Sequence, residues 1–404
     1  MKKNWLIVMM IFIVSAAITC SYEDDPSEPE DEPDPINTEA LEYVKAMGFG
    51  VNLGNTFDSL NTGNIAGETG WGNPRVSLDF IKSLKTHGFK SVRVPVSWVD
   101  YMGEAPDYLI EETWMARIEE VVDWILEEDL FCILNLHHDG GGEINSSGYI
   151  HPKYWIKQIS IPEKEEEVTN RFIKVWEQIA TRFEDKSDKL VLEAMNEIGF
   201  DNIWNRYSGG QVEEKKEAYR LVNKLNQVFV DTVRSTGGKN TDRFLLFCGY
   251  WTDIAATLDP LFLVPQDSAE ARLILSVHFY DPYQFTMEMQ TTWGAPWHYN
   301  SLNNRIKSLE GPFIKKGIPI ILGEYAVNIR NQGRGSGTLK EPESRQLWMF
   351  EVTQLCIDLG ISPILWETGM RNNNNGMADV QRSSPFNISE NLKYVFDNLV
   401  YPDE

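Results

Sequence analysis

The chain has 404 residues, of which 42% are hydrophobic, with 13 Trp, 15 Tyr and 19 Phe, so it can fill one large core or two ordinary ones. This content excludes disorder for most of the chain. The formal net charge is −23 and no tract is rich in Lys or Arg, which argues against a nucleic-acid partner because phosphate binding requires a basic surface. An uncharged substrate is compatible with such an acidic chain.

Residues 1–20 have the pattern of an export signal. A basic start is followed by an apolar stretch of 14 residues from Trp5 to Ile18, shorter than the about 20 residues that span a membrane. The ending AAITC resembles a bacterial lipoprotein box, in which Cys20 is lipidated and becomes the first mature residue. We therefore expect a lipid anchor at Cys20. The alternative is an ordinary signal peptide cut nearby, which would give a secreted or periplasmic protein.

The segment after Cys20, SYEDDPSEPEDEPDPINTEA, contains nine acidic residues, four prolines and no Lys or Arg. Because it cannot bury a core, residues 21–36 are expected to form an extended, disordered tether. The acidic residues directly after Cys20 also resemble the export signal of surface-exposed lipoproteins in Bacteroidetes-type bacteria. We expect a protein anchored at the outer membrane or cell surface, with residues 37–404 as its single catalytic domain.

From residue 48 onward, short apolar runs alternate with amphipathic stretches. The runs cover residues 48–53, 90–96, 130–136, 189–195, 243–249, 272–279, 318–324 and 361–366. Helical spacing is clearest over 76–88, 114–130, 167–183 and 217–237. Strands that are apolar on both faces and separated by helices indicate a parallel sheet covered by helices. Eight such units predict a (β/α)8 TIM barrel, whereas an open doubly wound sheet would carry a Gly-rich phosphate turn after its first strand, which NLGNTFD is not.

Polar side chains follow most of these predicted strands. In a barrel of this kind the active site lies at the carboxyl ends of the strands, so these residues are the candidate site. They are Arg93, His137, His138, Asn196, Glu197, His278, Tyr280, Glu324 and Trp366, with Asn55, Trp98, Trp204, Trp251, Trp293 and Trp297 in nearby loops.

Each of these residues also has a structural alternative. Arg93 inside an apolar strand can form a structural ion pair, a single His near a barrel rim can be a satisfied structural group, and Trp residues often fill cores. Glu197 and Glu324 differ because each ends an apolar strand and both should open on the same rim. Two carboxyl groups facing each other, beside aromatic and hydrogen-bonding side chains, are what glycoside hydrolysis requires: one protonated acid and one ionised group.

The ordered motifs GFGVNLGNTFDSL, GETGWGNP, FKSVRVPVSW, ILNLHHDG, LVLEAMNEIG, SVHFYDPY, PIILGEYA and PILWETG resemble glycoside hydrolase family 5, and within it the endoglucanases and xyloglucanases of subfamily 4. The resemblance runs from residue 47 to about 380. It implies that Glu197 is the acid/base and Glu324 the nucleophile of a retaining mechanism. It further implies that Arg93, His137, Asn196, His278, Tyr280 and Trp366 match active-site positions, with His138 and Asn55 as further contacts.

The same resemblance assigns roles to the supporting residues. Asn196 would bind the sugar 2-hydroxyl, Tyr280 and Arg93 would steady the nucleophile, and Trp366 would form a sugar platform. The sequence departs from the family pattern at Ile198, where the family usually has Pro, and in the Asn-rich stretch 372–375. The first departure affects the course of a loop, and the second affects the subsite that this stretch borders.

The expected activity is therefore endo-acting cleavage of β-1,4-glucosidic linkages in a cell-wall glucan: cellulose-like, mixed-linkage glucan or xyloglucan. A β-mannanase or xylanase of the same family is the alternative, and a non-catalytic glycan-binding lipoprotein is a rival of another class. We expect no cofactor or metal. The three remaining cysteines lie in apolar runs without ligand spacing, and a metal-dependent barrel would carry a His-x-His pair on its first strand. A monomer is the default expectation.

Overall fold

The computed structural model describes residues 38–60, 67–140, 153–330, 337–369 and 376–402. Its centre is a closed barrel of eight strands in sequence order, in which each strand pairs parallel with the next and β8 returns to β1. The strands are β1 (Gly50–Asn52), β2 (Ser91–Val94), β3 (Phe131–Asn135), β4 (Leu190–Glu193), β5 (Leu245–Asp253), β6 (Leu273–Phe279), β7 (Ile320–Tyr325) and β8 (Ser362–Leu365). All eight predicted strands are confirmed, as is the (β/α)8 fold.

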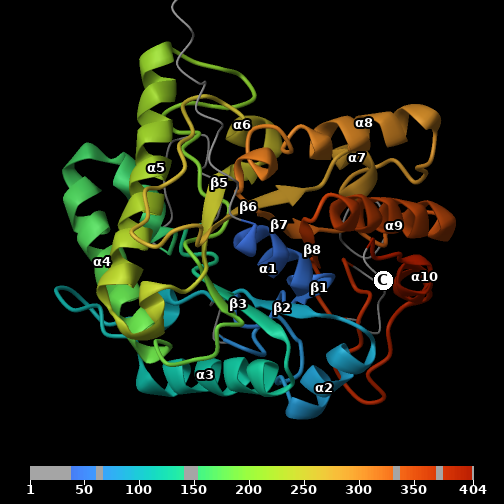
Figure 1. The fold of residues 1–404 in the computed structure, drawn as a ribbon, viewed down its shortest axis with the longest axis horizontal. Coiled ribbons are helices and arrows are strands. Elements are labelled where there is room, and N and C mark those ends of the chain that lie inside the picture. Colours follow the sequence, from blue (N-terminus) through green and yellow to red (C-terminus); the bar gives the residue numbers. More distant parts are fainter. Residues whose placement is uncertain (1–37, 61–66, 141–152, 331–336, 370–375, 403–404) are drawn as a thin grey trace, which may run out of the picture. The chain divides into compact units, whose positions relative to one another are not determined.

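Helices surround the strands, as Figure 1 shows. They are α1 (Glu39–Met47), α2 (Leu78–Thr86), α3 (Glu112–Glu127), α4 (Glu165–Arg182), α5 (Val212–Ser235), α6 (Ile254–Thr257), α7 (Tyr283–Thr286), α8 (Pro296–Lys307), α9 (Pro342–Asp358) and α10 (Glu390–Asn398). The four stretches with clear helical spacing correspond to α2, α3, α4 and α5. Each presents an apolar stripe to the strands; in α3 that stripe includes Ile118, Val122 and Ile125.

Alternate residues of each strand face opposite sides of the barrel wall. Residues such as Ile133 and Ile274 form one buried cluster inside the barrel, which α1 joins through Val44 and Met47. Their strand neighbours, such as Leu134, belong to the larger cluster between the strands and the surrounding helices. Helix α1 lies across the centre of the barrel in Figure 1 and therefore closes one end of it. The carboxyl ends of the strands form the other end, where the candidate residues gather.

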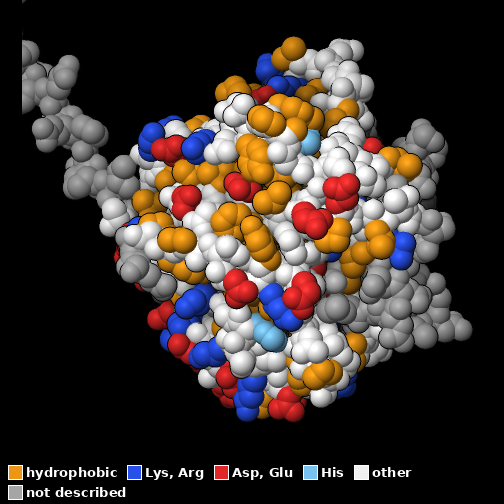
Figure 2. Space-filling view, turned by 90° about the vertical axis from the view of Figure 1, so that its right-hand side faces the viewer, with side chains coloured by type: hydrophobic (Ala, Val, Ile, Leu, Met, Phe, Trp, Pro, Cys, Tyr) orange, Lys and Arg blue, Asp and Glu red, His pale blue; other side chains and the backbone are white. Residues whose placement is uncertain are grey.

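Three further features bear on the sequence predictions. Cys132, Cys248 and Cys356 are buried and free, as expected. No helix in the described ranges is both long and apolar enough to cross a membrane. On the face shown in Figure 2, basic side chains are interspersed with acidic and apolar ones. The predicted signal, the Cys20 anchor, the tether and the Asn-rich stretch 372–375 lie outside the described residues.

Candidate active site

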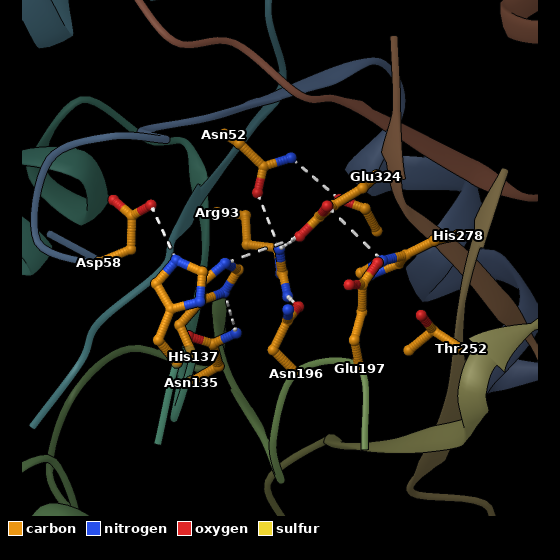
Figure 3. Close-up of polar contacts among 12 residues, drawn as sticks. Asn52, Asp58, Arg93, Asn135, His137, Asn196, Glu197, Thr252, His278 and Glu324 are labelled. Carbon is orange, nitrogen blue, oxygen red and sulfur yellow. Dashed lines mark hydrogen bonds and ion pairs between the residues drawn. The ribbon is translucent and has the colours of Figure 1, made fainter. Parts of the chain in front are cut away.

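Arg93 on β2 links the side chains beneath the cleft. Its guanidinium is fully buried and donates from Nε to Glu193 Oε2 at 2.6 Å and from Nη2 to Asn196 Oδ1 at 2.8 Å. From Nη1 it donates to Glu324 Oε1 at 2.8 Å and to Asn52 Oδ1 at 3.0 Å. Figure 3 shows Arg93 at the centre of these contacts. Burial acts to lower the pKa of Arg93, but the two carboxylates raise it above its ordinary value, so the guanidinium stays charged.

Glu324, at the end of β7, is held by two donors. Arg93 donates to Oε1, and the Tyr280 hydroxyl donates to Oε2 at 3.0 Å. Only 6% of the Glu324 side chain is exposed. Burial raises the pKa of Tyr280 well above its usual range, so this hydroxyl remains a donor at any working pH. Glu324 is therefore fixed in orientation with both oxygens hydrogen-bonded.

Glu197 lies opposite, in the turn that follows β4. Its side chain is 36% exposed, and Oε1 is 2.8 Å from Nδ1 of His278 on β6. One carboxyl oxygen of Glu197, one of Glu324 and one nitrogen of His278 all lie within 4.8 Å of one another. Strands β4 and β7 therefore bring the two carboxyl groups together, as the sequence predicts, with Glu197 on the more open side.

The surroundings shift the pKa values of the two carboxyl groups in opposite directions. Burial is the largest influence on Glu324 and, with the charge of Glu197, raises its pKa against the lowering effects of His278 and Arg93. Burial also acts to raise the pKa of Glu197, but the hydrogen bond and charge of His278, with the charges of Arg206 and Arg93, lower it overall. His278 is therefore the largest influence that lowers the pKa of either carboxyl group.

His278 lies between the two carboxyl groups. Its Nδ1 atom is 2.8 Å from Glu197 Oε1 and 3.6 Å from Glu324 Oε2. Its Nε2 atom is buried and has no hydrogen-bond partner among the described residues. When Nδ1 carries a hydrogen, the imidazole donates to Glu197 Oε1, which leaves Oε2 of Glu197 as the oxygen that can carry a proton. The contacts from Arg93 and Tyr280 favour the anion at Glu324.

His137, His138 and Trp366 line the cleft on the side of β3 and β8. The rings of His137 and Trp366 are stacked, with centroids 5.4 Å apart and an interplanar angle of 6°. Burial lowers the pKa of His137 well below its ordinary value and lowers that of His138 to about 4, so burial favours the neutral form of both rings. His138 Nε2 lies 3.8 Å from Oδ2 of the buried Asp58. These groups offer neutral hydrogen bonds and a flat aromatic surface.

The cleft has a volume of about 1140 Å³. Eight of the nine residues predicted at the strand ends line it: His137, His138, Asn196, Glu197, His278, Tyr280, Glu324 and Trp366. Arg93 lies beneath these residues, and Asn55 is in the loop after β1, outside the lining that the described residues form. Of the loop tryptophans, Trp204 and Trp251 line the cleft, Trp98 and Trp293 are buried, and Trp297 is 61% exposed.

Several supporting residues were not predicted from the sequence. Asn52 and Glu193 contact Arg93, while Asn135 and Ser276 donate to Glu193 at 3.0 and 2.9 Å. The available signal was a polar residue inside an apolar run, the same signal that singled out Arg93. Ile198, the unexpected residue of its motif, is fully buried.

Two groups of side chains in the described parts of the chain have the composition of metal ligands: Asp58 with His137 and His138, and Glu197 with His278 and Glu324. Both adjoin or form the cleft. The second group consists of the two opposed carboxylates and the imidazole between them, which also suits acid–base and nucleophilic chemistry without a metal.

Comparison with known proteins identifies the family of this chain. The family model described as "Cellulase (glycosyl hydrolase family 5)" matches residues 46–374. Endoglucanase A of Paenibacillus barcinonensis is 32% identical over 375 residues, which cover 87% of this chain and 88% of that protein. The xyloglucan-specific endo-β-1,4-glucanase of Bacteroides ovatus is 33% identical over 348 residues, covering 82% of this chain and 65% of its own length.

The fold agrees with solved structures as well. A GH5-4 broad specificity endoglucanase from an uncultured bovine rumen ciliate superimposes with a TM-score of 0.75 at 31% identity, covering 89% of this chain and 97% of that one. Both the extent of the family match and the similarity over most of the chain bear out the resemblance in the sequence. The chain belongs to glycosyl hydrolase family 5.

Proposed function

We propose that the protein is a retaining endo-β-1,4-glucanase in which Glu324 is the nucleophile and Glu197 is the general acid and base. The observation that carries the proposal is the approach of the two carboxyl groups, which have oxygens within 4.8 Å of each other. Retaining glycosidases place these groups about 5–5.5 Å apart, whereas inverting enzymes leave room for a water between them.

Their different environments support the division of roles. Glu324 accepts hydrogen bonds from Arg93 and Tyr280, which favour its anion against the effect of burial and fix the orientation of its oxygens. Glu197 has one imidazole contact and is six times as exposed, 36% against 6%, so it can reach a leaving group at the open side of the cleft. The first group suits attack on carbon, and the second suits proton transfer.

The reaction then has two steps. In the first, Glu324 attacks the anomeric carbon while the glycosidic C–O bond breaks, and Glu197 gives its proton to the departing oxygen. In the second, the Glu197 anion takes a proton from water, whose oxygen attacks the same carbon and releases Glu324. Asn196 is oriented through Oδ1 by Arg93, so its amide Nδ2 is the group expected to donate to the sugar 2-hydroxyl.

The direct test uses Glu197→Ala and Glu324→Ala. Each variant should hydrolyse glucan orders of magnitude more slowly while its circular dichroism spectrum stays unchanged. Added azide should restore turnover of an activated β-cellobioside by Glu197→Ala and yield a β-glycosyl azide, because azide then replaces water in the second step. Near-normal hydrolysis by either variant would refute the proposal.

The proposed substrate is a cell-wall β-1,4-glucan, cleaved at internal linkages. The names of the relatives support this class, since one is xyloglucan-specific and another is a broad specificity endoglucanase. The ring of Trp366, with that of Trp204 also in the cleft lining, suits the flat faces of glucose units. Product sizing on xyloglucan, mixed-linkage glucan, cellulose, mannan and xylan tests the class; selective cleavage of mannan or xylan would favour those alternatives.

We also propose that the enzyme is anchored to the outer membrane and faces the cell exterior. The support is the lipoprotein-like ending at Cys20 and the acidic segment that follows it. Replacement of Cys20 by Ala should abolish incorporation of labelled palmitate and release activity from the membrane fraction, whereas an ordinary signal peptide predicts no change. A monomer is expected by light scattering of the enzyme without its first 20 residues.

Two rival functions predict different experimental results. A non-catalytic glycan-binding protein would bind glucan tightly without producing reducing ends. A metal-dependent hydrolase built on either ligand-like group would lose activity with a chelator and regain it with the ion. The proposed mechanism predicts new reducing ends and no loss of activity with a chelator.

A further inference from the structure

The turn that carries Glu197 has a strained backbone. Glu197 has φ of +22°, in the left-handed region that residues with a side chain rarely adopt. Such conformations are energetically unfavourable and persist only where the surrounding structure enforces them. The position of the Glu197 carboxyl group therefore depends on whatever holds this turn.

A second strained segment lies directly beside it. Trp251 and Thr252, near the end of β5, have φ of +54° and +50°. The pairing of β5 with β6 shifts register between Cys248 and Asp253, so these residues leave the regular ladder. Both line the cleft, and Figure 3 shows Thr252 on the same side of the site as Glu197 and His278.

The two segments are joined by hydrogen bonds. The Trp251 backbone N–H donates to the Ile198 carbonyl at 2.7 Å, one residue after Glu197. The indole Nε1–H of Trp251 donates to Asp201 Oδ1 at 3.1 Å. The turn is thus attached to Trp251 through both backbone and side chain.

Packing fixes the indole ring in this place. A Cβ atom at Gly199 would lie 2.0 Å from Nε1 and 2.1 Å from Cδ1 of Trp251, so the ring rests directly on the turn. Two cationic groups also lie over the indole ring: Lys157 Nζ is 3.9 Å and Arg206 Cζ is 4.7 Å from its centroid. These cations restrain the indole ring, while its Nε1–Cδ1 edge packs against the turn at Gly199.

We propose that Trp251 is a positioning residue for Glu197: it holds the strained turn so that the carboxyl group reaches the departing oxygen. This role rests on the proposed function of Glu197 as general acid. It differs from service as a sugar platform, which would contribute binding, and from general packing, which would contribute stability. The position of the indole also explains why residue 199 is glycine, because a Cβ atom there would overlap the ring.

The test uses aryl β-cellobiosides whose leaving groups differ in acidity. 2,4-Dinitrophenolate leaves without a proton, whereas phenolate needs one, and both substrates occupy the same subsites. For Trp251→Phe, which keeps a ring but loses the N–H to Asp201, and for Gly199→Ala, kcat/KM should fall about 10- to 100-fold with the phenyl substrate. It should change less than about threefold with the dinitrophenyl substrate. Matched controls are Trp297→Phe, at an exposed ring, and Gly311→Ala, whose added methyl meets nothing within 4 Å.

The outcomes separate this inference from the proposed function. In the reference variant Glu197→Ala, kcat/KM should depend most steeply on the acidity of the leaving group; if it does not depend on it, the proposed role of Glu197 is wrong. The inference about Trp251 is overturned if Glu197→Ala shows this dependence but Trp251→Phe and Gly199→Ala lose activity equally on all substrates, or lose no activity. Trp251→Phe supplies the answer by itself if Gly199→Ala does not fold.

Discussion

Glu193 provides a sharp test of the buried charge arrangement beneath the cleft. It is fully buried in β4, with Oε2 2.6 Å from Arg93 Nε, and Arg93 is itself fully buried. Glu193→Ala leaves the guanidinium with one carboxylate partner instead of two. Because removal of one member of a buried ion pair typically costs about 3–5 kcal/mol, the free energy of unfolding should fall by that amount.

Glu193→Gln separates charge from shape. A glutamine can keep contacts with Arg93, Asn135 and Ser276, so its loss of stability should be smaller, about 1–2 kcal/mol. Without the second anion, Arg93 favours the Glu324 anion more strongly, so the pKa of Glu324 should fall. The acidic limb of the pH profile of kcat/KM should therefore move to lower pH, by about one unit.

The stability assay is guanidinium chloride unfolding followed by tryptophan fluorescence. The control is Glu213→Gln on α5, where the Glu213 side chain is 81% exposed in its pair with Lys216 and its removal should change stability by less than about 1 kcal/mol. The reasoning is refuted if Glu193→Ala loses no more stability than this control. It is also refuted if the acidic limb of Glu193→Gln stays in place or moves to higher pH.

The remaining predictions concern the nucleophile, a buried carboxyl group and the aromatic platform. Tyr280→Phe removes the 3.0 Å donor to Glu324, so kcat/KM should fall about 100-fold and the acidic limb should move to higher pH; an unchanged limb would contradict this. Burial raises the pKa of Glu367 from 4.5 to about 7, so the folded state loses stability as the pH rises from about 4.5 to 7. This loss of unfolding free energy should be on the order of 1–3 kcal/mol and should be absent from Glu367→Gln. The denaturant midpoint of the variant should therefore depend less on pH than that of the wild type, and an equal pH dependence in both proteins would contradict the prediction. A Cβ at Gly54 would lie 2.7 Å from the Glu367 carbonyl oxygen and 2.9 Å from the Trp366 ring, so the segment that carries this ring must shift in Gly54→Ala. The variant should have a kcat/KM on glucan at least tenfold lower, and unchanged kinetics would contradict this expectation.

The barrel was predictable because each strand is a short apolar run, which needs burial on both faces. The site was predictable where a polar residue ends such a run, as at Glu197 and Glu324. These positions lie on one rim only because the strands are parallel and close into a barrel. The prediction of the site therefore depended on the prediction of the fold.

Other features depend on partners that sequence spacing does not reveal. Glu193 lies within an apolar strand, but its contact with Arg93 requires the inward register of both strands. The contacts of His278 Nδ1 with both carboxyl groups depend on packing that spacing in the sequence does not reveal. The strained turn at Glu197 and its support by Trp251 come from backbone angles and a ring position. The lipid anchor at Cys20 remains a prediction.

The most direct test of the central claim is to trap the covalent intermediate. A 2-deoxy-2-fluoro-β-cellobioside with a dinitrophenyl leaving group should inactivate the enzyme and add one glycosyl unit. The fluorine slows both steps, but the good leaving group restores the rate of the first step only, so the covalent intermediate accumulates. Peptide mass spectrometry should then place that unit on Glu324. Labelling of Glu197, or turnover with no labelled peptide, would contradict the assignment of Glu324 as the nucleophile.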